Sequence, residues 1–286
     1  MRCLVTGSSG LLGSYLLKTA NPSDFIYSKR FDILDKSATY KAFDEAKPEV
    51  VIHCAGEGRV DFAETNRCEA WQTTYEGCQM VLKASEYWGA TFVQISSNAV
   101  YAGDAPPYNE NSYRFPVNTY GRYKAECDNL VGDSRTSTMI IRPIMMYGWP
   151  SYGRRDNFVT RLIKSLRTEG LKSFCQIPVD NEIISQPTYA YDCAVAIWKA
   201  LKTHPVLKRE FNIAAAEKTT LYSFALQVAK VFDLDPGSLT PVKSSQIPVV
   251  AKRPVDTTFS LKKIHGEGIF LRNQEEGLKA MKAEIE

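Results

Sequence analysis

A glycine-rich turn close to the start of the chain limits the possible folds more than any other feature. The run Thr6-Gly7-Ser8-Ser9-Gly10-Leu11-Leu12-Gly13 follows the apolar segment 2–6 and precedes the helical segment 11–19. Its three glycines allow a tight turn, let the backbone approach a ligand, and leave space for a helix to pack on a strand. A helix that begins there points free N–H groups at a phosphate. The run therefore predicts a nucleotide-binding strand–turn–helix unit, with a plain structural turn as the alternative.

Short apolar segments alternate with longer helical segments through the first half of the chain. The expected strands are residues 2–6, 25–28, 50–55, 91–96 and 138–142, and the expected helices are 11–19, 37–46, one long helix over 63–88, and 156–168. This order predicts an α/β fold, a Rossmann-type doubly wound parallel sheet. The rhythm changes after Pro143. We therefore expect residues 1–145 to form a dinucleotide-binding Rossmann domain. Residues 146–286 should form mainly a smaller C-terminal substrate-binding lobe, with some segments returning to the Rossmann sheet.

Composition excludes several classes of protein. The 286 residues carry 35 basic and 32 acidic side chains without a basic block, which does not predict a nucleic-acid surface. The seven cysteines lack a C-x-x-C pair and the three histidines lie far apart, so no disulfide framework and no metal site is expected. No apolar run approaches the roughly 18 residues of a membrane span, and no signal-peptide core is present. We expect a cytoplasmic protein that binds small molecules and has no membrane partner.

The end of the second expected strand bears on the choice between NADP and NAD. Rossmann folds that prefer NAD usually present an acidic residue to the ribose hydroxyls, whereas a basic residue accommodates the 2′-phosphate of NADP. The chain reads Ser28-Lys29-Arg30 at this point, so Lys29 and Arg30 favour NADP. Asp32 or Asp35 would serve NAD instead, and a solvated loop without a cofactor role is the third alternative.

Ser97, Tyr120 and Lys124 form a candidate catalytic set. Tyr120 and Lys124 are four residues apart and share one helix face, and Ser97 follows an expected strand, where such sheets open onto the cofactor crevice. A nearby ammonium stabilises a phenolate and lowers the tyrosine pKa from about 10 toward working pH. We expect Tyr120 to protonate the alkoxide formed in a reduction, Ser97 to bind the substrate carbonyl, and Lys124 also to hold the nicotinamide ribose. A solvated helix face is the alternative.

Ordered motifs along the whole chain resemble the extended short-chain dehydrogenase/reductases, in particular the dTDP-4-dehydrorhamnose reductase family. Beside the glycine-rich turn, the matching segments are 32–35, 48–56, 60–64, 95–101, 107–110, 116–121, 141–143, 147–148, 156–159, 186–190 and 252–254. The resemblance implies reduction of a 4-keto (deoxy)sugar nucleotide by NAD(P)H, with hydride transfer to the C4 ketone and a tyrosine as proton donor. It also allows a homodimer.

The resemblance assigns roles to individual residues. It carries catalysis onto Ser97, Tyr120 and Lys124. The cofactor contacts expected from the residue patterns and the resemblance together, with NADP preferred and NAD second, are Gly7, Ser9, Gly10, Leu11, Leu12, Lys29, Arg30, Asp32, Ile33, Cys54, Ala55, Gly56, Tyr120, Lys124, Arg142 and Pro143. The implied substrate contacts are Ser97, Asn98, Asn157, Thr188 and Arg253, the last as a diphosphate ligand. A helix cap at Asn157 and a surface ion pair at Arg253 are the alternatives.

The chain departs from the family pattern in places that border the presumed sugar site. Thr74 stands where the family usually has asparagine, which puts the backbone support at that point in question. Ser185-Gln186 replaces a small pair before Pro187-Thr188, and the loop over residues 148–155 is aromatic and basic. The identity of the sugar and of the nucleotide therefore stays open.

Missing residues separate the rival functions. A 4,6-dehydratase of the superfamily needs an aspartate and a glutamate where this chain has Asn98 and Ala99, and an epimerase-reductase would need a cysteine at 99. A 4-epimerase that retains NAD is the enzymatic alternative, because the same catalytic set serves both reactions. A non-catalytic NADP-binding regulatory subunit is the alternative of another class, since the beta subunit of methionine adenosyltransferase resembles the same branch.

Overall fold

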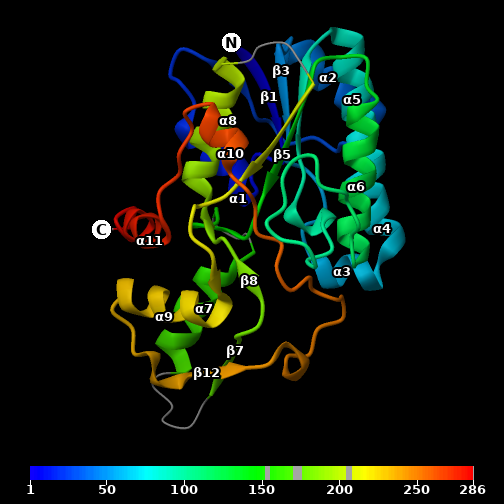
Figure 1. The fold of residues 1–286 in the computed structure, drawn as a ribbon. Coiled ribbons are helices and arrows are strands. Elements are labelled where there is room, and N and C mark those ends of the chain that lie inside the picture. Colours follow the sequence, from blue (N-terminus) through cyan, green and yellow to red (C-terminus); the bar gives the residue numbers. More distant parts are fainter. Residues whose placement is uncertain (152–154, 170–175, 204–207, 286) are drawn as a thin grey trace.

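A parallel sheet of six strands forms the centre of the computed structural model, which describes residues 1–151, 155–169, 176–203 and 208–285 (Figure 1). In spatial order the strands are β10 (Arg209–Ile213), β5 (Thr138–Pro143), β4 (Thr91–Ile95), β3 (Val50–His53), β1 (Arg2–Thr6) and β2 (Phe25–Tyr27). The chain runs outward in one direction from β1 to β2 and in the other from β3 onward, so the order reverses between β1 and β3. The predicted Rossmann-type fold is confirmed, and the five expected strands end within two residues of their predicted bounds.

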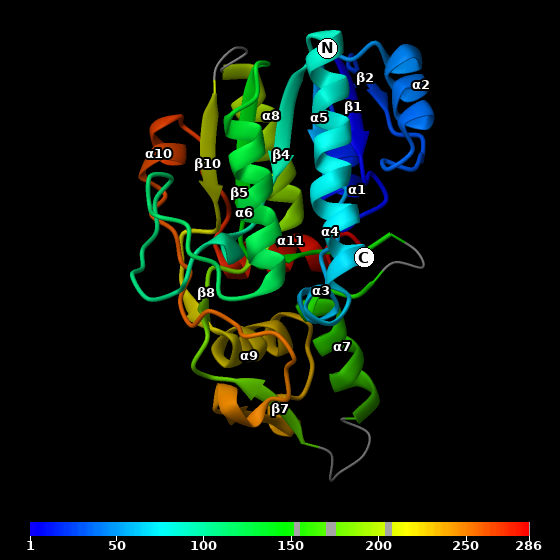
Figure 2. The same ribbon diagram turned by 90° about the vertical axis from the view of Figure 1, so that its right-hand side faces the viewer.

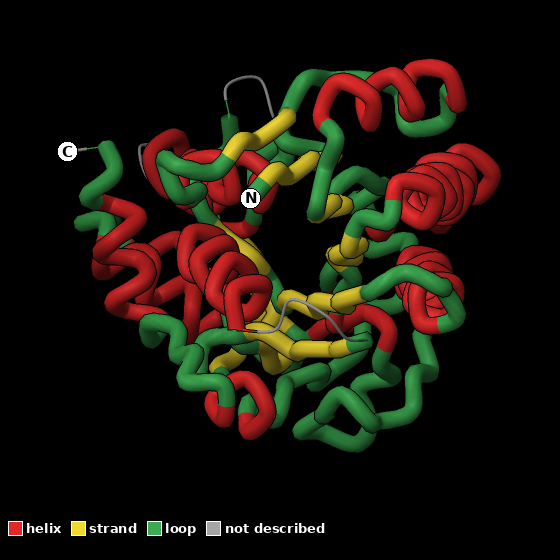
Figure 3. The backbone as a smooth tube through the Cα atoms, turned by 90° about the horizontal axis from the view of Figure 1, so that it is seen from above, coloured by secondary structure: helices red, strands yellow, loops and turns green. Residues whose placement is uncertain are grey.

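Successive side chains along each strand point to opposite faces of the sheet and pack in two separate hydrophobic cores, as strand geometry requires. Cys3 and Val5 of β1 pack in the core shared with α1 (Leu11–Thr19) and α8 (Ala190–Thr203). Leu4 points to the other core, formed with α2 (Lys36–Ala46), α5 (Gly77–Trp88) and α6 (Thr119–Gly132). Figures 2 and 3 show these two helix groups on opposite faces of the sheet. Burial on both faces explains why the strands read as continuous apolar runs.

The segment 63–88 is not the single helix that its composition predicts. It belongs to α3 (Val60–Thr65), α4 (Arg67–Trp71), the π-helical turn η1 (Gln72–Glu76) and α5. Asn66 leaves the helical region of backbone space, with φ −121° and ψ 56°, and separates α3 from α4. In η1 the Gly77 N–H bonds to the Gln72 carbonyl, the wider i→i+5 pattern that is frequent at functional sites.

The later part of the chain adds a smaller group of elements below the carboxyl ends of the strands (Figure 1). It contains α7 (Phe158–Glu169), α9 (Leu221–Val231) and three two-stranded pairs: β7 (Ile177–Asp180) with β12 (Leu239–Val242), β6 (Met146–Tyr147) with β9 (Thr188–Tyr189), and β8 (Ile184–Ser185) with β11 (Thr219–Thr220). The remaining elements are α10 (Lys262–Gly266), α11 (Gln274–Lys282) and the 3₁₀ turns η2 (Asn98–Val100), η3 (Pro236–Ser238) and η4 (Ser244–Gln246).

The C-terminal segment ties α1 to the loop that follows β6. The Glu284 carboxylate accepts hydrogen bonds from the Tyr15 hydroxyl at 2.8 Å and from Tyr189, and it pairs with Lys18 at 2.6 Å. The Tyr15 hydroxyl in turn accepts the Trp149 backbone N–H at 2.9 Å. Elements far apart in the sequence therefore hold this loop against α1.

Three features expected from composition concern cysteines, metals and membranes. The six cysteines in the part of the chain that the structure describes are free thiols, and Cys175 lies outside it. Within the same residues, no group of three His, Cys, Asp or Glu side chains is placed to hold a metal. No helix found among residues 1–151, 155–169, 176–203 and 208–285 has the length and apolar character of a membrane span.

A buried ion-pair network joins β5, α6 and β10. The guanidinium of Arg142 is fully buried, and its Nε donates to Asp128 at 2.8 Å while Nη1 pairs with Glu210 at 2.7 Å. A charge in an apolar interior is tolerated only when it is paired. Asp128 is itself buried, so the two groups depend on each other.

We predict that Asp128→Asn destabilises the protein by roughly 3 kcal/mol, because it leaves the buried Arg142 with one fewer compensating charge. The free energy of unfolding in urea measures the effect. Lys279→Ala is the control, since it removes an exposed pair with Glu275 on α11 and should cost less than about 1 kcal/mol. Equal losses for the two variants would contradict the role of the network.

Candidate active site

The glycine-rich turn lies where the strand order reverses, between β1 and the loop that follows β3. Gly7 has a positive φ of 64°, and a Cβ added there would lie 2.6 Å from the Ala55 nitrogen. A Cβ at Gly13 would lie 2.4 Å from the Gly7 carbonyl oxygen. Gly10 is the N-cap of α1 and no side chain caps the helix, so its first N–H groups stay available to an anion. The turn has the form of a phosphate cradle.

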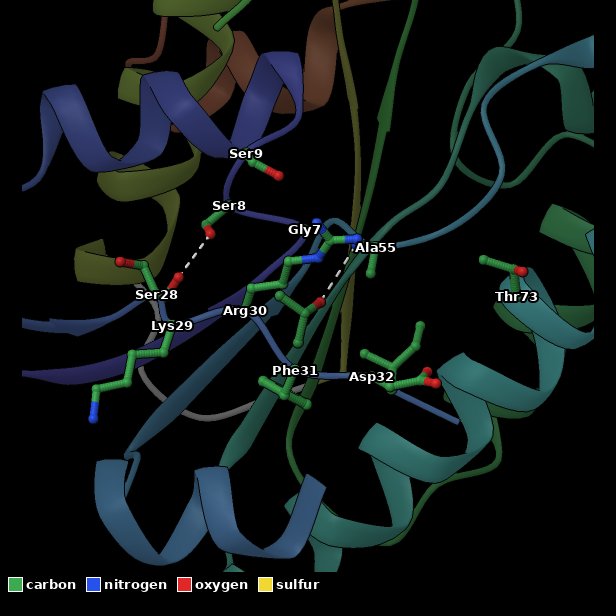
Figure 4. A pocket seen from close by; sticks show the side chains of 12 residues that line it. Gly7, Ser8, Ser9, Ser28, Lys29, Arg30, Phe31, Asp32, Ala55 and Thr73 are labelled. Atoms are coloured by element: carbon green, nitrogen blue, oxygen red, sulfur yellow. Dashed lines mark hydrogen bonds between the residues drawn. The ribbon is translucent and has the colours of Figure 1, made fainter. Parts of the chain in front are cut away.

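A cleft of about 910 Å³ opens beside this turn, and we call it the nucleotide cleft (Figure 4). Its lining residues are Thr6, Gly7, Ser8, Ser9, Ser28, Lys29, Arg30, Phe31, Asp32, Ile33, Ala55 and Thr73. The Ser8 hydroxyl donates to the Ser28 carbonyl at 3.0 Å, and the Thr6 hydroxyl accepts the Ala55 N–H at 3.3 Å. These bonds connect the walls that β1, β2 and β3 contribute.

The charged residues of the nucleotide cleft are not equivalent. Lys29 pairs with Glu45 of α2 at 3.0 Å and points away from the cleft, whereas Arg30 points into it (Figure 4). Among the residues that the structure describes, Arg30 makes no ion pair. Asp35 caps α2 by accepting the Ala38 N–H at 3.1 Å, and the Asp32 carboxylate accepts the Leu34 N–H at 2.9 Å. Both acidic alternatives thus have local structural roles, although Asp32 also lines the cleft, and Arg30 is a cation that points into it.

A second cleft of about 810 Å³ begins at the start of α1, and we call it the catalytic cleft. Its lining residues are Gly10, Leu11, Gly56, Glu57, Gly58, Arg59, Val60, Ser96, Ser97, Asn98, Tyr120, Pro143, Met145, Met146, Pro150, Arg155, Asp156, Asn157 and Arg161. The two clefts share the glycine-rich turn, because residues 7–9 line the first and residues 10–11 line the second. A ligand longer than either cleft therefore has a continuous wall to follow.

Ser97 and Tyr120 both line the catalytic cleft, on different elements. Ser97 lies two residues after the end of β4 and caps η2, where its hydroxyl accepts the Ala99 N–H at 3.2 Å and donates to Asn98 Oδ1 at 3.3 Å. The Asn98 amide is fixed by a 2.6 Å bond to the Thr257 hydroxyl. Tyr120 lies in the first turn of α6 and is half-buried. Within the described chain its hydroxyl has no hydrogen-bond partner, so it is free to meet a ligand.

Lys124 is a buried cation beneath the loop that follows β3. Its ammonium donates to the Ile95 carbonyl at 2.9 Å, and a Cβ added at Gly56 would lie 3.6 Å from Nζ. Burial by itself lowers the pKa of Lys124, but electrostatic interactions with Tyr120 and with neighbouring cysteine and aspartate side chains outweigh it and raise the pKa. Lys124 therefore stays charged one helical turn from Tyr120.

Two further residues, His53 and Thr74, form hydrogen bonds close to Lys124. Burial and the charge of Lys124 lower the pKa of His53 to about 3, and its Nδ1 bonds to the Thr6 hydroxyl at 2.8 Å, so the imidazole is neutral. Thr74 lies in the π-helical turn, where its hydroxyl accepts the Glu57 N–H at 3.2 Å. The threonine that replaces the family's asparagine thus supplies a hydrogen bond to the loop after β3.

The structure does not bring every expected site residue into a cleft. The Arg142 guanidinium is held by Asp128 and Glu210, so its side chain does not face either cleft, and its expected cofactor contact stays a prediction for the backbone. Thr188 is fully buried, and its hydroxyl donates to the Gln186 carbonyl at 2.8 Å rather than facing a substrate. The Leu12 side chain packs in the core, so that only its backbone lies near the turn.

Two other expected substrate contacts have structural partners. The Arg253 guanidinium pairs with Asp61 at 2.8 Å, and Arg253 does not line the catalytic cleft. Asn157 caps α7 by accepting the Val159 N–H at 3.1 Å, and it lines the cleft as well. Cys54 is partly buried, and burial raises its pKa to about 12, so it contributes backbone rather than a reactive thiol.

Sequence analysis missed three arginines that line the catalytic cleft. Arg59 precedes α3, Arg155 precedes α7, and Arg161 lies on α7. The basic character of the loop over residues 148–155 was the available signal for Arg155; residues 152–154 of this loop lie outside the described chain.

Comparison with known proteins gives matches over the whole chain. The family model for the RmlD substrate binding domain matches residues 1–286. Methionine adenosyltransferase 2 subunit beta of Bos taurus is 26% identical over 289 residues, covering 94% of this chain and 83% of that protein. The dTDP-4-dehydrorhamnose reductase of Sinorhizobium fredii is 26% identical over 294 residues, covering 98% and 96%. The crystal structure of the Bacillus anthracis dTDP-4-dehydrorhamnose reductase in complex with NADP has a TM-score of 0.90, at 28% identity and 99% coverage of each chain.

We predict that Gly7→Ala lowers the free energy of unfolding by roughly 2 kcal/mol or more, because the added Cβ meets backbone and the positive φ disfavours L-residues. The variant should also lose nucleotide affinity. Gly132→Ala is the control, since nothing lies within 4 Å of its Cβ position at the end of α6. It should be neutral or stabilise by about 0.5 kcal/mol. Urea titration compares the two, and a Gly7→Ala variant as stable as Gly132→Ala would contradict the close contact.

Proposed function

Because this chain belongs to the RmlD substrate binding domain family, as its sequence motifs predicted, we propose that it is an NADPH-dependent reductase of a 4-keto sugar nucleotide, similar to the dTDP-4-dehydrorhamnose reductases. One observation carries the proposal: Ser97 and Tyr120 line a single cleft that starts at the glycine-rich turn, with the Lys124 ammonium buried one helical turn from Tyr120. The likeness to a reductase in complex with NADP supports it.

The residues of the two clefts fit NADP. Glycine at positions 7 and 13 leaves space that a Cβ would fill, and the uncapped start of α1 offers N–H groups to a diphosphate. Arg30 points into the nucleotide cleft and provides a cation for the 2′-phosphate. When bound, NADPH supplies the hydride for the reduction.

Within the catalytic cleft, this chain's own residues bind the ketone and provide the proton. Ser97 donates a hydrogen bond to the substrate carbonyl and polarises it. Tyr120 then transfers its hydroxyl proton to the alkoxide oxygen at C4, and its own phenolate is stabilised by the Lys124 ammonium. Lys124 is suited to this task because it is charged, buried and fixed by the Ile95 carbonyl.

We propose the division of labour expected from the sequence. Residues 1–145 hold the dinucleotide, and residues 146–286 mainly bind the substrate, with some segments returning to the Rossmann sheet. The position of Asn157 in the catalytic cleft supports this division. A cytoplasmic location and a homodimer stay predictions.

Two alternatives make different demands on the cofactor. A 4-epimerase uses the same catalytic set but regenerates its NAD, so it shows no net cofactor consumption. A non-catalytic regulatory subunit is favoured by one observation, the 26–27% identity to methionine adenosyltransferase 2 subunit beta proteins. Spectroscopic assay of NADPH with a panel of 4-keto sugar nucleotides separates the reductase from both alternatives. Stoichiometric oxidation supports the reductase, whereas tight NADPH binding without turnover would favour the regulatory role.

We predict that Tyr120→Phe lowers kcat by roughly 10²- to 10⁴-fold and leaves NADPH affinity unchanged, because the ring remains and only the proton donor is lost. Tyr123→Phe is the matched control on the same helix, where the hydroxyl donates to the Arg67 carbonyl at 3.2 Å outside the catalytic cleft. Steady-state kinetics measures both variants. A Tyr120→Phe enzyme that retains more than about a tenth of the wild-type rate would exclude Tyr120 as the acid.

We predict that Arg30→Ala weakens NADPH binding by roughly 10- to 100-fold, because a charge-assisted bond to the 2′-phosphate is lost, and that it leaves NADH binding unchanged. Lys29→Ala should have little effect, since Lys29 is exposed and paired with Glu45. The double variant should therefore resemble Arg30→Ala. Fluorescence titration with each cofactor provides the test, and equal weakening of NADPH and NADH would refute the assignment of Arg30.

A further inference from the structure

The charged residues of the catalytic cleft do not balance. Three arginines line it, Arg59, Arg155 and Arg161, together with the two carboxylates Glu57 and Asp156. Arg59 is taken up by Glu57 through two bonds, Nε to Oε1 at 2.9 Å and Nη2 to Oε2 at 2.5 Å. The other two cations are Arg155, which precedes α7, and Arg161, which lies on α7.

The second carboxylate is also neutralised from within the protein. Asp156 pairs with Lys164 of α7 at 2.6 Å. Consequently, neither Arg155 nor Arg161 has an ion-pair partner among the residues that the structure describes. Two guanidinium groups facing one cleft without a counter-charge repel each other and attract an anion.

The effect of these neighbours on Arg155 is consistent with this arrangement. Partial burial and the positive charges of Arg161 and Arg59 lower the pKa of Arg155, against a smaller opposing effect of Glu57 and Asp61. An anion between the guanidiniums removes the repulsion. Arginine suits phosphate oxygens because its planar fork donates two parallel hydrogen bonds.

We propose that Arg155 and Arg161 form the subsite that holds the diphosphate of a nucleotide substrate in the catalytic cleft. The inference rests on the proposed function for the claim that the diphosphate belongs to a sugar nucleotide. A diphosphate bridged between two organic groups carries two negative charges, which matches the two guanidiniums that have no ion-pair partner in the described part of the chain. Ser97 and Tyr120 line the same cleft, so one molecule can reach the catalytic groups from this subsite.

The proposal differs from the role that the family resemblance implies for Arg253. That guanidinium pairs with Asp61 at 2.8 Å and donates to the Ala251 carbonyl at 3.0 Å. Asp61 also accepts the Ala251 N–H at 3.0 Å, so the three residues form a closed structural unit. Arg253 is therefore already neutralised by a carboxylate, whereas Arg155 and Arg161 have no carboxylate partner among the described residues.

Isothermal titration of the full chain, saturated with NADP⁺, tests the proposal with dTDP and UDP as probes. The double variant Arg155→Ala Arg161→Ala should lose at least about tenfold in affinity for the diphosphate that the wild type binds more tightly. Arg253→Ala is the matched control and should lose less than about threefold. Unchanged NADP⁺ affinity and thermal midpoint establish that the variants are folded.

Each outcome decides the proposal. A wild type that binds neither dTDP nor UDP, a double variant with unchanged affinity, or a larger loss for Arg253→Ala would overturn it. If the double variant does not fold, the single variants Arg155→Gln and Arg161→Gln are measured instead. Each should lose part of the affinity for the nucleoside diphosphate. The reductase assay is separate: loss of dTDP binding without wild-type turnover would uphold the subsite and reject the reductase. Turnover with an unaltered KM in the double variant would uphold the reductase and reject the subsite.

Discussion

The structure depends on a backbone approach that only glycine permits. At Gly7 and Gly13 the nearest atoms to an added Cβ belong to the backbone of Ala55 and of Gly7 itself, so no side chain can rotate away to make room. The strands on either side are paired in the sheet, with Thr6 of β1 opposite His53 of β3. The turn is therefore held in place from both ends. As a result, the start of α1 lies beside the loop after β3, at the point where the strand order reverses and where doubly wound sheets bind their ligands.

A buried lysine completes the site around this turn. An ammonium in a protein interior is costly unless polar groups replace its water. Lys124 meets that requirement through the Ile95 carbonyl at the end of β4 and through the acidic groups around it. The π-helical turn contributes on the other side, since Thr74 bonds the backbone of Glu57 in the loop above Lys124. The positions of α6, β4 and η1 are thus coupled, and Tyr120 enters the cleft because α6 is anchored one turn later.

Much of this arrangement follows from local sequence patterns. Most of the parts that could not be predicted share one cause: they depend on contacts between residues far apart in the chain. Continuous apolar runs bounded by glycine or proline located five strands to within two residues, and the glycine spacing located the phosphate cradle. The break at Asn66 was missed because asparagine within a helical pattern is a weak breaking signal compared with proline or glycine. The burial of the Arg142 and Thr188 side chains could not be read from the sequence, because burial is a property of the packed fold and motif positions do not reveal which face a residue presents.

Charge pairing explains why the roles of the basic residues were hardest to infer. A cation that an internal carboxylate has already neutralised attracts an external anion less strongly than an unpaired cation does. Lys29 is paired with a residue 16 positions away and Arg253 with one 192 positions away, so neither pairing can be read from neighbouring letters. Arg30 stands next to Lys29 in the chain, yet it points into the cleft while Lys29 does not. The fold therefore selects which arginines and lysines can bind phosphate by where it places Glu45, Asp61 and Glu57. Basic residues at expected family positions are candidates whose availability depends on these distant carboxylates.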